Sequence, residues 1–236
     1  MANKPAKPIL YTNRRCPWAH RVHIILEELK LDYEEVTIDL DKPRTPEYLK
    51  INPRGKVPAL SHDGEILIES DVIANYLADT FPPRLLPASN SPGGPRYRAR
   101  VTLFVNSFKE KVWDVLTQLY TTTSDKERAE IVEKAISGLE AEVEPKLSDA
   151  NPFFGGSTKL TQAEVLTASL AIRVYTLAQT DIYPTQLWPT IAQRAPHFAE
   201  WTKAISAHPS VTSIYDPAAT IATAKSWIAK AQAAKN

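Results

Sequence analysis

The single cysteine of the chain, Cys16, is the residue whose type and position offer the most chemistry. It lies between a short apolar run, residues 9–11, and an amphipathic run that opens with Pro17. Proline is favoured at the first position of a helix, so Cys16 is predicted at or beside a helix N-cap. Free amide N–H groups and the positive end of the helix dipole favour a thiolate there. Three arginines are close in the chain and favour it further: Arg14, Arg15 and Arg21. We therefore expect a lowered pKa and nucleophilic thiol chemistry at Cys16.

The alternative is that Cys16 is a small buried residue of the core, as free cysteines often are. A dithiol enzyme would carry its second cysteine three positions later, where this chain has Ala19. Without that partner, an oxidised Cys16 must pair with a thiol from outside the chain. A small thiol such as glutathione is the obvious candidate.

Composition places the chain among ordinary globular proteins and excludes several classes of function. Its 236 residues indicate two modest domains, and its net charge of +1 favours neither nucleic acid nor an anionic membrane as a partner. The first residues, MANKPAKP, lack the apolar core of a signal peptide, so we expect a cytoplasmic protein. His20 and His23 lie one helical turn apart without a third ligand nearby, and no metal site is predicted.

The first third of the chain predicts a mixed sheet covered by helices. A strand at residues 9–11 and a helix from Pro17 precede a half-buried strand at 36–40 and a short helix from Pro46. Two further strands flank Asp63-Gly64, a strong hairpin signal, and a helix capped by Ser70 follows. We expect four strands with helices packed on them, in a domain of residues 1–82.

The remainder of the chain predicts helices only. Residues 83–96 are rich in proline and contain a Gly-Gly pair, so they are expected to form a linker before an all-helical domain of residues 97–236. Thr161 and Glu164 have the spacing of a capping box, and Pro196 and Pro217 mark two later helix starts. The lysines at 225, 230 and 235 are most simply a solvated helix face.

Three motifs together resemble the cytosolic glutathione transferases: CPWA at 16–19, NPRGKVPAL at 52–60 and ESDVIANYL at 69–77. A thioredoxin-like α/β domain with a mixed four-stranded sheet, followed by an all-α domain, is what this resemblance implies. The segment LTQAEV at 160–165 is similar to the capping-box helix of the family, with Glu164 where aspartate is more usual. Cysteine followed by proline and an aromatic residue resembles the omega class and its fungal relatives.

The resemblance also implies a glutathione site. Pro58 is expected to follow a cis bond, which leaves the backbone of Val57 free to pair with the cysteinyl part of glutathione. Glu69 would pair with the ammonium of the γ-glutamyl group, and Ser70 would hold its carboxylate at a helix N-terminus. For the glycine carboxylate we favour Lys56, with Lys42 and Arg44 as the other candidates.

A second pocket is harder to predict. Trp18 is expected either to wall the pocket of the second substrate or to pack in the core. Tyr11 lies mid-strand and more simply packs than acts as a catalytic hydroxyl. Residues of the helical half could line the pocket, although each is more simply a core residue: Phe108, Trp113, Tyr120, Arg173, Tyr175 and Trp188.

The predicted function is that of an omega-like glutathione transferase in detoxification, with Cys16 catalytic through a mixed disulfide with glutathione as co-substrate. Deglutathionylation and dehydroascorbate reduction fit this scheme, with a small electrophilic, disulfide or quinone-type molecule as the second substrate. One alternative is a transferase that conjugates glutathione to electrophiles, and another is a non-catalytic ligandin-type binding protein. The resemblance implies a homodimer.

Overall fold

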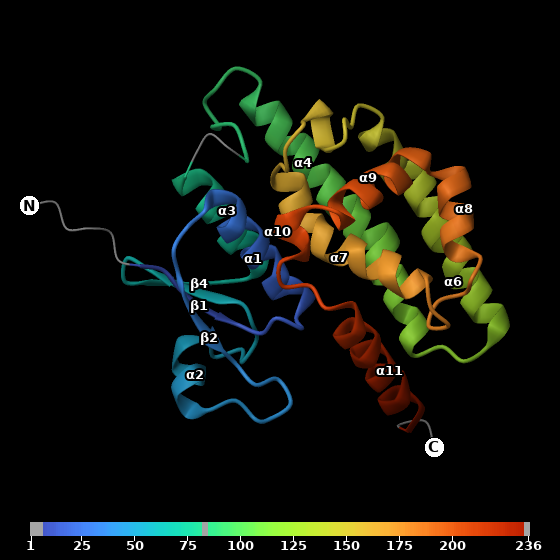
Figure 1. The fold of residues 1–236 in the computed structure, drawn as a ribbon, viewed down its shortest axis with the longest axis horizontal. Coiled ribbons are helices and arrows are strands. Elements are labelled where there is room, and N and C mark those ends of the chain that lie inside the picture. Colours follow the sequence, from blue (N-terminus) through green and yellow to red (C-terminus); the bar gives the residue numbers. More distant parts are fainter. Residues whose placement is uncertain (1–6, 82–84, 234–236) are drawn as a thin grey trace, which may run out of the picture.

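The computed structural model describes residues 7–81 and 85–233, and its first part is a four-stranded mixed sheet (Figure 1). The strands are β1 (Ile9–Thr12), β2 (Glu34–Thr37), β3 (Ala59–His62) and β4 (Glu65–Ile68), in the spatial order β2-β1-β3-β4. β1 runs parallel to β2 and antiparallel to β3, and β3 pairs antiparallel with β4. Asp63 and Gly64 both have positive φ, 48° and 85°, which suits the tight turn of a hairpin. The predicted mixed sheet and hairpin are confirmed.

Three helices complete this first part: α1 (Pro17–Leu29), α2 (Pro46–Ile51) and α3 (Ser70–Thr80). α1 and α3 lie against one face of the sheet and α2 lies on the other (Figure 1). Leu10 and Leu60 point from the sheet into the core formed with α1 and α3. Tyr48 of α2 packs in a separate small cluster with Val57, beside the N-terminus of α1.

Local details of this part differ from the sequence-based expectation. β2 ends at Thr37, so Ile38 and Leu40 lie outside the strand. The N-cap of α3 is Glu69, with φ at 68°, and Ser70 is therefore the first residue of the helix rather than its cap. Val72 of this helix is 48% exposed, while Ile73 beside it is fully buried in the core.

The remaining described residues fold into helices, without a strand among residues 85–233. The segments are α4 (Gly94–Phe108), η1 (Lys109–Trp113), α5 (Asp114–Leu116), η2 (Thr117–Tyr120), α6 (Asp125–Gly138), η3 (Leu139–Val143), η4 (Glu144–Leu147), η5 (Phe154–Gly156), α7 (Gln162–Ala178), α8 (Leu187–Arg194), α9 (Pro196–Ser206), α10 (Pro209–Thr212) and α11 (Pro217–Ala233). α4 begins at Gly94, inside the predicted linker, and residues 83 and 84 of that linker lie outside the described residues. α8 and α10 were not predicted.

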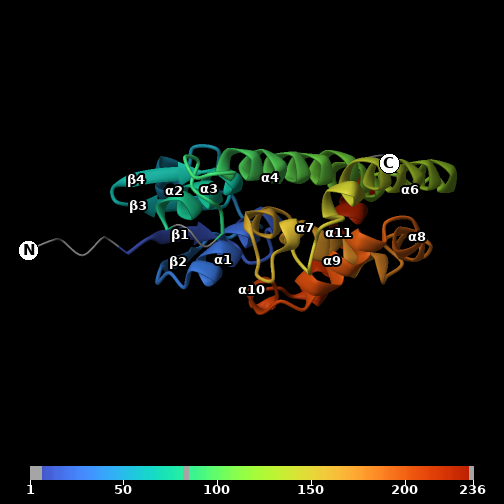
Figure 2. The ribbon, with the colours of Figure 1, turned by 90° about the horizontal axis from the view of Figure 1, so that it is seen from above.

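α7 is the central helix of the helical part, and it is buried over almost its whole length. It packs against α1 and α3 of the first part and against α4 and α9 of its own. The sheet lies at one end of the molecule and α6 and α8 at the other, with α7 between them (Figure 2). Gln162 at its start donates from Nε2 to Asn75 Oδ1 of α3 at 3.0 Å. A single apolar core therefore runs through both parts of the chain.

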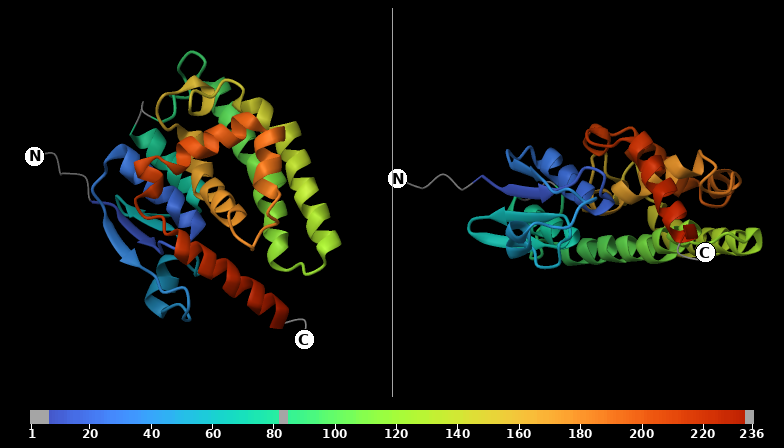
Figure 3. Two further views of the ribbon diagram at one scale, coloured as in Figure 1. Left: turned by 45° about the vertical axis from the view of Figure 1, so that its right-hand side comes forward. Right: turned by 90° about the horizontal axis from the view of Figure 1, so that it is seen from below.

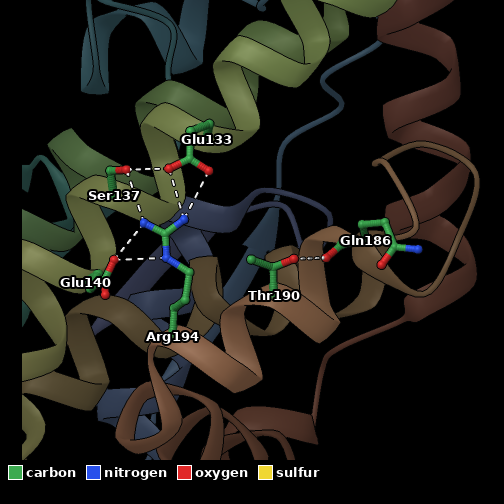
Figure 4. A network of polar contacts seen from close by, with 6 residues as sticks. All are labelled: Glu133, Ser137, Glu140, Gln186, Thr190 and Arg194. Carbon is green, nitrogen blue, oxygen red and sulfur yellow. Dashed lines mark hydrogen bonds and ion pairs between the residues drawn. The ribbon is translucent and has the colours of Figure 1, made fainter.

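An arginine joins α8 to the helix beside it (Figure 4). The Arg194 guanidinium donates to Glu133 of α6 at 2.9 Å and to Glu140 of η3 at 2.6 Å. Ser137, one turn after Glu133, donates its hydroxyl to the Glu133 carboxylate at 2.7 Å. This cluster lies far along the helical part from Cys16 and is structural.

Candidate active site

All seven residues predicted for the site line one pocket of about 610 Å³: Cys16, Trp18, Lys56, Val57, Pro58, Glu69 and Ser70. The loops at the ends of the strands form most of its wall, and Val105, Asn106 and Lys109 of the helical part close it. A pocket of this size, at the junction of two parts of a chain, is typical of a small-molecule site.

Cys16 occupies the N-cap of α1, as predicted, and its sulfur faces both the pocket and the backbone of the neighbouring loop. Its Sγ lies 3.7 Å from the carbonyl oxygen of Val57. The backbone N–H groups of Trp18 and Ala19 are directed at the sulfur and favour its thiolate. The geometry expected at the helix start is therefore present.

The expected lowering of the Cys16 pKa is wrong. Burial raises the pKa of the thiol above its ordinary value of 9.0. The hydration that a buried thiolate loses outweighs the stabilisation that it gains from nearby N–H groups and positive charges. The two amide groups oppose this shift, as do the positive charges of Arg173 and Arg21. The free thiol is therefore the main form of Cys16 at neutral pH.

Two of the three arginines close to Cys16 in the sequence form ion pairs with carboxylates. Arg14 donates to the Glu35 carboxylate from Nε at 3.0 Å and from Nη2 at 2.8 Å. Arg15 pairs with Asp41 at 2.5 Å. The positive charges that act on the sulfur come instead from Arg21 and from Arg173, which the sequence offered only as a pocket wall or a core residue.

The loop before β3 has the geometry that the resemblance implied. The Val57–Pro58 bond is cis. The Val57 N–H has no hydrogen-bond partner among the described residues, and its carbonyl has only the weak contact with the Cys16 sulfur. This short edge is open to pair with the backbone of a bound peptide.

The N-terminus of α3 forms the second part of the pocket. The Ser70 hydroxyl accepts a long hydrogen bond, 3.4 Å, from Nη1 of Arg21, which is only 4% exposed. Nε of Arg21 has no partner among the described residues. Glu69 forms an ion pair with Arg54. The helix end and a buried guanidinium thus present hydrogen-bond donors and positive charge, a combination suited to a carboxylate.

The three cations considered for the glycine carboxylate differ in how they are engaged. Arg44 donates to the carbonyl oxygens of Asp39, Lys42 and Gly55 and thereby holds its own loop together. Lys42 pairs with Asp39 at 3.5 Å and does not line the pocket. Lys56 lines the pocket and, among the described residues, has no ion-pair partner.

Trp18 forms a wall between this pocket and a smaller one. Its ring meets Trp113 edge-on at 6.4 Å, and the Arg21 guanidinium lies 4.5 Å from its centroid. The smaller pocket, of about 300 Å³, is lined by Arg15, Cys16, Pro17, Trp18, Leu40, Asp41, Thr223, Trp227 and Lys230. Trp18 thus packs against Trp113 and also lines both pockets, and Cys16 borders both pockets as well.

The contribution of α11 to the smaller pocket was missed from the sequence. Trp227 is 43% exposed on this helix, and Lys230, expected on a solvated face, borders the pocket with it. In the sequence, the apolar residues of this helix predicted only that it packs against the core. The fold that brings residue 227 beside residue 16 leaves no local pattern in the sequence.

The two histidines of α1 are buried hydrogen-bonding residues. Nε2 of His20 donates to the Val211 carbonyl at 2.9 Å, while its Nδ1 accepts from Arg173 at 3.0 Å. His23 bonds to Thr12 and Tyr33. Burial lowers the pKa of His20 to about 3 and that of His23 to about 4. The described part of the chain contains no cluster of three or more metal-ligating side chains.

Comparison with known proteins agrees with this geometry. Residues 6–79 match the family described as "Glutathione S-transferase, N-terminal domain". Over these residues the chain is similar to glutathione transferase N-terminal domains. The matched residues include the cysteine, the cis-proline loop and the α3 start, which line the larger pocket.

Curated relatives resemble part of the chain only. A maleylacetoacetate isomerase of Pseudomonas aeruginosa is 41% identical over 96 residues, which are 39% of this chain and 43% of that protein. The chain therefore aligns with less than half the length of this relative. No helix within the described ranges is long and apolar enough to cross a membrane.

Solved glutathione transferases share the fold over nearly the whole chain. Glutathione transferase Omega 1C of Trametes versicolor superposes with a TM-score of 0.81 at 22% identity, covering 96% of this chain and 98% of the other. Rice GST1, solved in complex with glutathione, superposes with a TM-score of 0.79 at 24% identity, covering 97% of this chain and 99% of the other. The helical part thus also has the glutathione transferase fold.

Proposed function

We propose that the protein is a glutathione-dependent thiol transferase of the omega-like kind, with Cys16 as its catalytic residue. The observation that carries the proposal is the make-up of the larger pocket. Cys16 supplies its sulfur, while Ser70 alone among the described lining residues carries a side-chain hydroxyl. Tyr11 is not in this pocket and packs against Tyr48 at 5.9 Å. A covalent role for the sulfur is therefore favoured over activation of glutathione by a hydroxyl beside it.

Glutathione would bind with its sulfur at Cys16. Its cysteinyl backbone would pair with the open edge of Val57, and its γ-glutamyl carboxylate would lie at Ser70 near the buried Arg21. The ammonium would approach Glu69, exchanging with the Arg54 ion pair. Lys56 would bind the glycine carboxylate, since Arg44, which also lines the pocket, already donates to three backbone carbonyl oxygens.

The reaction we propose is a pair of thiol–disulfide exchanges. The Cys16 thiolate attacks the glutathionyl sulfur of a mixed disulfide, which forms the Cys16–glutathione bond and releases the substrate thiolate. The thiolate of a second glutathione attacks the same sulfur, giving oxidised glutathione and free Cys16. One substrate disulfide is reduced and one glutathione disulfide is formed, so electrons balance. Deglutathionylation follows this scheme, and dehydroascorbate and quinone-linked thioethers are further substrates to test.

The thiolate needed for the first step is a minority form in the free protein, because burial raises the Cys16 pKa. The proposed reaction therefore accelerates as pH rises through the neutral range. Arg21 and Arg173 act as positioning residues that limit this penalty, since their charges favour the thiolate.

The second candidate is a glutathione-dependent conjugating or isomerising enzyme in which bound glutathione supplies the working thiolate. Two observations favour it: the raised Cys16 pKa and the similarity to a maleylacetoacetate isomerase. In that case Cys16 would be a neutral neighbour of the glutathione sulfur. A non-catalytic ligandin role requires that apolar ligands bind while glutathione does not.

Replacement of Cys16 separates these functions. We would compare wild type with Cys16→Ser and Cys16→Ala in disulfide reduction, in conjugation to a chlorodinitrobenzene, and in maleylacetoacetate isomerisation. Thiol transfer should fall by roughly a hundredfold or more in both variants. Mass spectrometry of wild type after oxidised glutathione should show one added glutathione that free glutathione removes.

Calorimetric binding of glutathione provides the control, because both variants should still bind it. Disulfide reduction that survives in Cys16→Ala would overturn the proposal. Isomerisation or conjugation that is efficient in wild type and unchanged in both variants would establish the second candidate. Failure of glutathione to bind at millimolar concentration, with binding of an apolar dye, would establish the ligandin role.

A further inference from the structure

α11 presents two different faces to two different cavities. Thr223, Trp227 and Lys230 follow one another at intervals of four and three residues, which places them on one face of the helix, and they line the smaller pocket beside Cys16. The opposite side, with Lys225 and Ile228, lines a separate cleft of about 470 Å³. The helix runs past the sheet on one side and the helical part on the other (Figure 3). α11 therefore supplies one wall of the space next to the reactive sulfur.

The walls of the smaller pocket include two indole rings. Trp18 stands on the side of the first domain, and Trp227 stands on α11, where its ring packs against Tyr120 at 5.5 Å and leaves 43% of its surface open. Leu40 adds an aliphatic wall. At about 300 Å³ the pocket is at the lower end of the range for small-molecule sites. Indole walls and a small volume fit a flat aromatic ring.

The charged groups at this pocket do not balance. Arg15 and Asp41 neutralise each other in an ion pair of 2.5 Å. Lys230 remains, and within the described part of the chain it has no carboxylate partner. Lys225, five positions earlier, pairs with Asp181 at 3.9 Å beside the other cleft. Among the described residues, the pocket next to Cys16 therefore carries one uncompensated positive charge.

We propose that the second-substrate pocket selects aromatic molecules that bear an acidic group, and that Lys230 is the residue that makes this selection. The inference rests on the proposed function, which places glutathione in the larger pocket and leaves the smaller one for the other reactant. The ring lies between Trp18 and Trp227, and its carboxylate, sulfonate or phenolate group lies at the Lys230 ammonium. Lys230 is a specificity residue and takes no part in the exchange at sulfur.

The expected preference is modest, because the Lys230 end of the pocket is open to solvent and water screens the charge. A partly exposed ion pair corresponds to a preference of about two- to fivefold for the charged ligand over a neutral one. The preference should shrink as salt is added.

The test uses two ligands with the same ring, naphthalene-2-sulfonate and the neutral naphthalene-2-sulfonamide, and measures their dissociation constants by calorimetry. The proteins are the full chain in wild-type form, Lys230→Gln, Lys230→Glu and the matched control Lys225→Gln. Wild type and Lys225→Gln should prefer the sulfonate about two- to fivefold. Lys230→Gln should bind both ligands equally, and Lys230→Glu should prefer the sulfonamide.

A fourth variant separates shape from charge. Trp227→Leu removes an aromatic wall, so it should weaken both ligands by a similar factor and leave their ratio unchanged. Equal binding of the two ligands to wild type would overturn the proposal. A sulfonate preference that survives in Lys230→Gln, or that is lost equally in Lys225→Gln, would also overturn it.

Two separate measurements keep this inference apart from the proposed function. One is the ratio of the two dissociation constants, which needs no reaction at sulfur, and the other is the dependence of thiol transfer on Cys16. Loss of the preference with intact thiol transfer would refute only the role of Lys230. A preserved preference with thiol transfer that does not depend on Cys16 would refute only the proposed function.

Discussion

Cys16 is subject to two opposing influences at the scale of single atoms. The helix start directs two amide N–H groups at its sulfur, and Arg21 and Arg173 add positive charge. Packing of the loop and of the helical part around the sulfur removes water and acts in the opposite direction. The desolvation effect is larger, since a thiolate depends strongly on hydration that a few fixed dipoles replace only in part.

The first prediction concerns the reactivity of this thiol. The rate of Cys16 alkylation by iodoacetamide should rise steadily from pH 7 to pH 9 without a plateau, because burial holds the pKa above its ordinary 9.0. Arg173→Met should lower the rate at each of these pH values, since it removes a charge that favours the thiolate. A plateau below pH 7 in wild type would contradict this prediction.

The two buried histidines should make the free energy of unfolding depend on pH. His20 and His23 have pKa values of about 3 and about 4, below the ordinary 6.5, so the native state binds fewer protons than the unfolded state below pH 6.5. The contribution of the two neutral histidines to the free energy of unfolding is complete above pH 6.5 and is lost as pH falls toward those pKa values. Each histidine removes up to about 1.4 kcal/mol of stability per pH unit in this window.

Urea unfolding between pH 6.5 and pH 5 tests this, because few carboxylates titrate there. The free energy of unfolding should decrease by up to about 2.8 kcal/mol per pH unit in wild type, and about half as steeply in His20→Gln. The glutamine Nε2 can keep the bond to the Val211 carbonyl without titrating. A free energy that stays constant over this range would contradict the assignment of both histidines as neutral.

At the scale of elements, a single carboxylate organises the start of the central helix. Glu164 is fully buried, and its oxygens accept hydrogen bonds from the Thr161 N–H and hydroxyl, the Phe154 N–H and the Trp201 indole, at 2.7–2.8 Å. The capping box predicted from the sequence accounts for the contacts with Thr161. The contacts with Phe154 and Trp201 tie η5 and α9 to the same residue.

Glu164→Ala should lower the free energy of unfolding by about 3–5 kcal/mol, because it leaves several buried donors without an acceptor. Glu164→Asp should cost less, since the shorter chain retains part of the cap. The matched control is Glu127→Ala, at the same third position of the exposed α6, with an expected change within about 0.5 kcal/mol. Urea unfolding of the three variants measures this, and a loss below 1 kcal/mol for Glu164→Ala would refute it.

At the scale of the whole molecule, the exposed apolar side chains indicate where a second copy would bind. Val72 of α3 is 48% exposed and Leu103 of α4 is 59% exposed. Between these two helices lies a groove of about 320 Å³. The homodimer implied by the family resemblance stays a prediction, and these two helices are its expected contact surface.

Val72→Glu and Leu103→Glu should each convert a dimer into monomers, because an interface core excludes an unpaired charge. Leu49→Glu, on α2 and at 39% exposure, is the matched control and should leave the mass unchanged. Light scattering after size-exclusion chromatography gives the masses. A wild-type monomer at micromolar concentration would refute the homodimer, and a dimer that tolerates both charges would refute this surface.

Features that depend on residues a few positions apart could be predicted from the sequence. Pro17 placed the start of α1, Asp63-Gly64 placed the hairpin, and Thr161 with Glu164 placed the start of α7. The motifs around Cys16, Val57 and Ser70 named residues that line one pocket, and the roles of those residues there stay a prediction. Such signals survive in the sequence because a helix start or a two-residue turn is set by local backbone preferences and local hydrogen bonds.

Features that depend on distant segments followed from the packing of the whole chain and could not be predicted from the sequence. Arg173 and Trp227 reach the surroundings of Cys16 from α7 and α11. The direction of the Cys16 pKa was decided in the same way, because desolvation sums over every atom packed around the sulfur. Local patterns in the chain predict a helix dipole, but they do not show how much water the folded molecule excludes from the Cys16 sulfur.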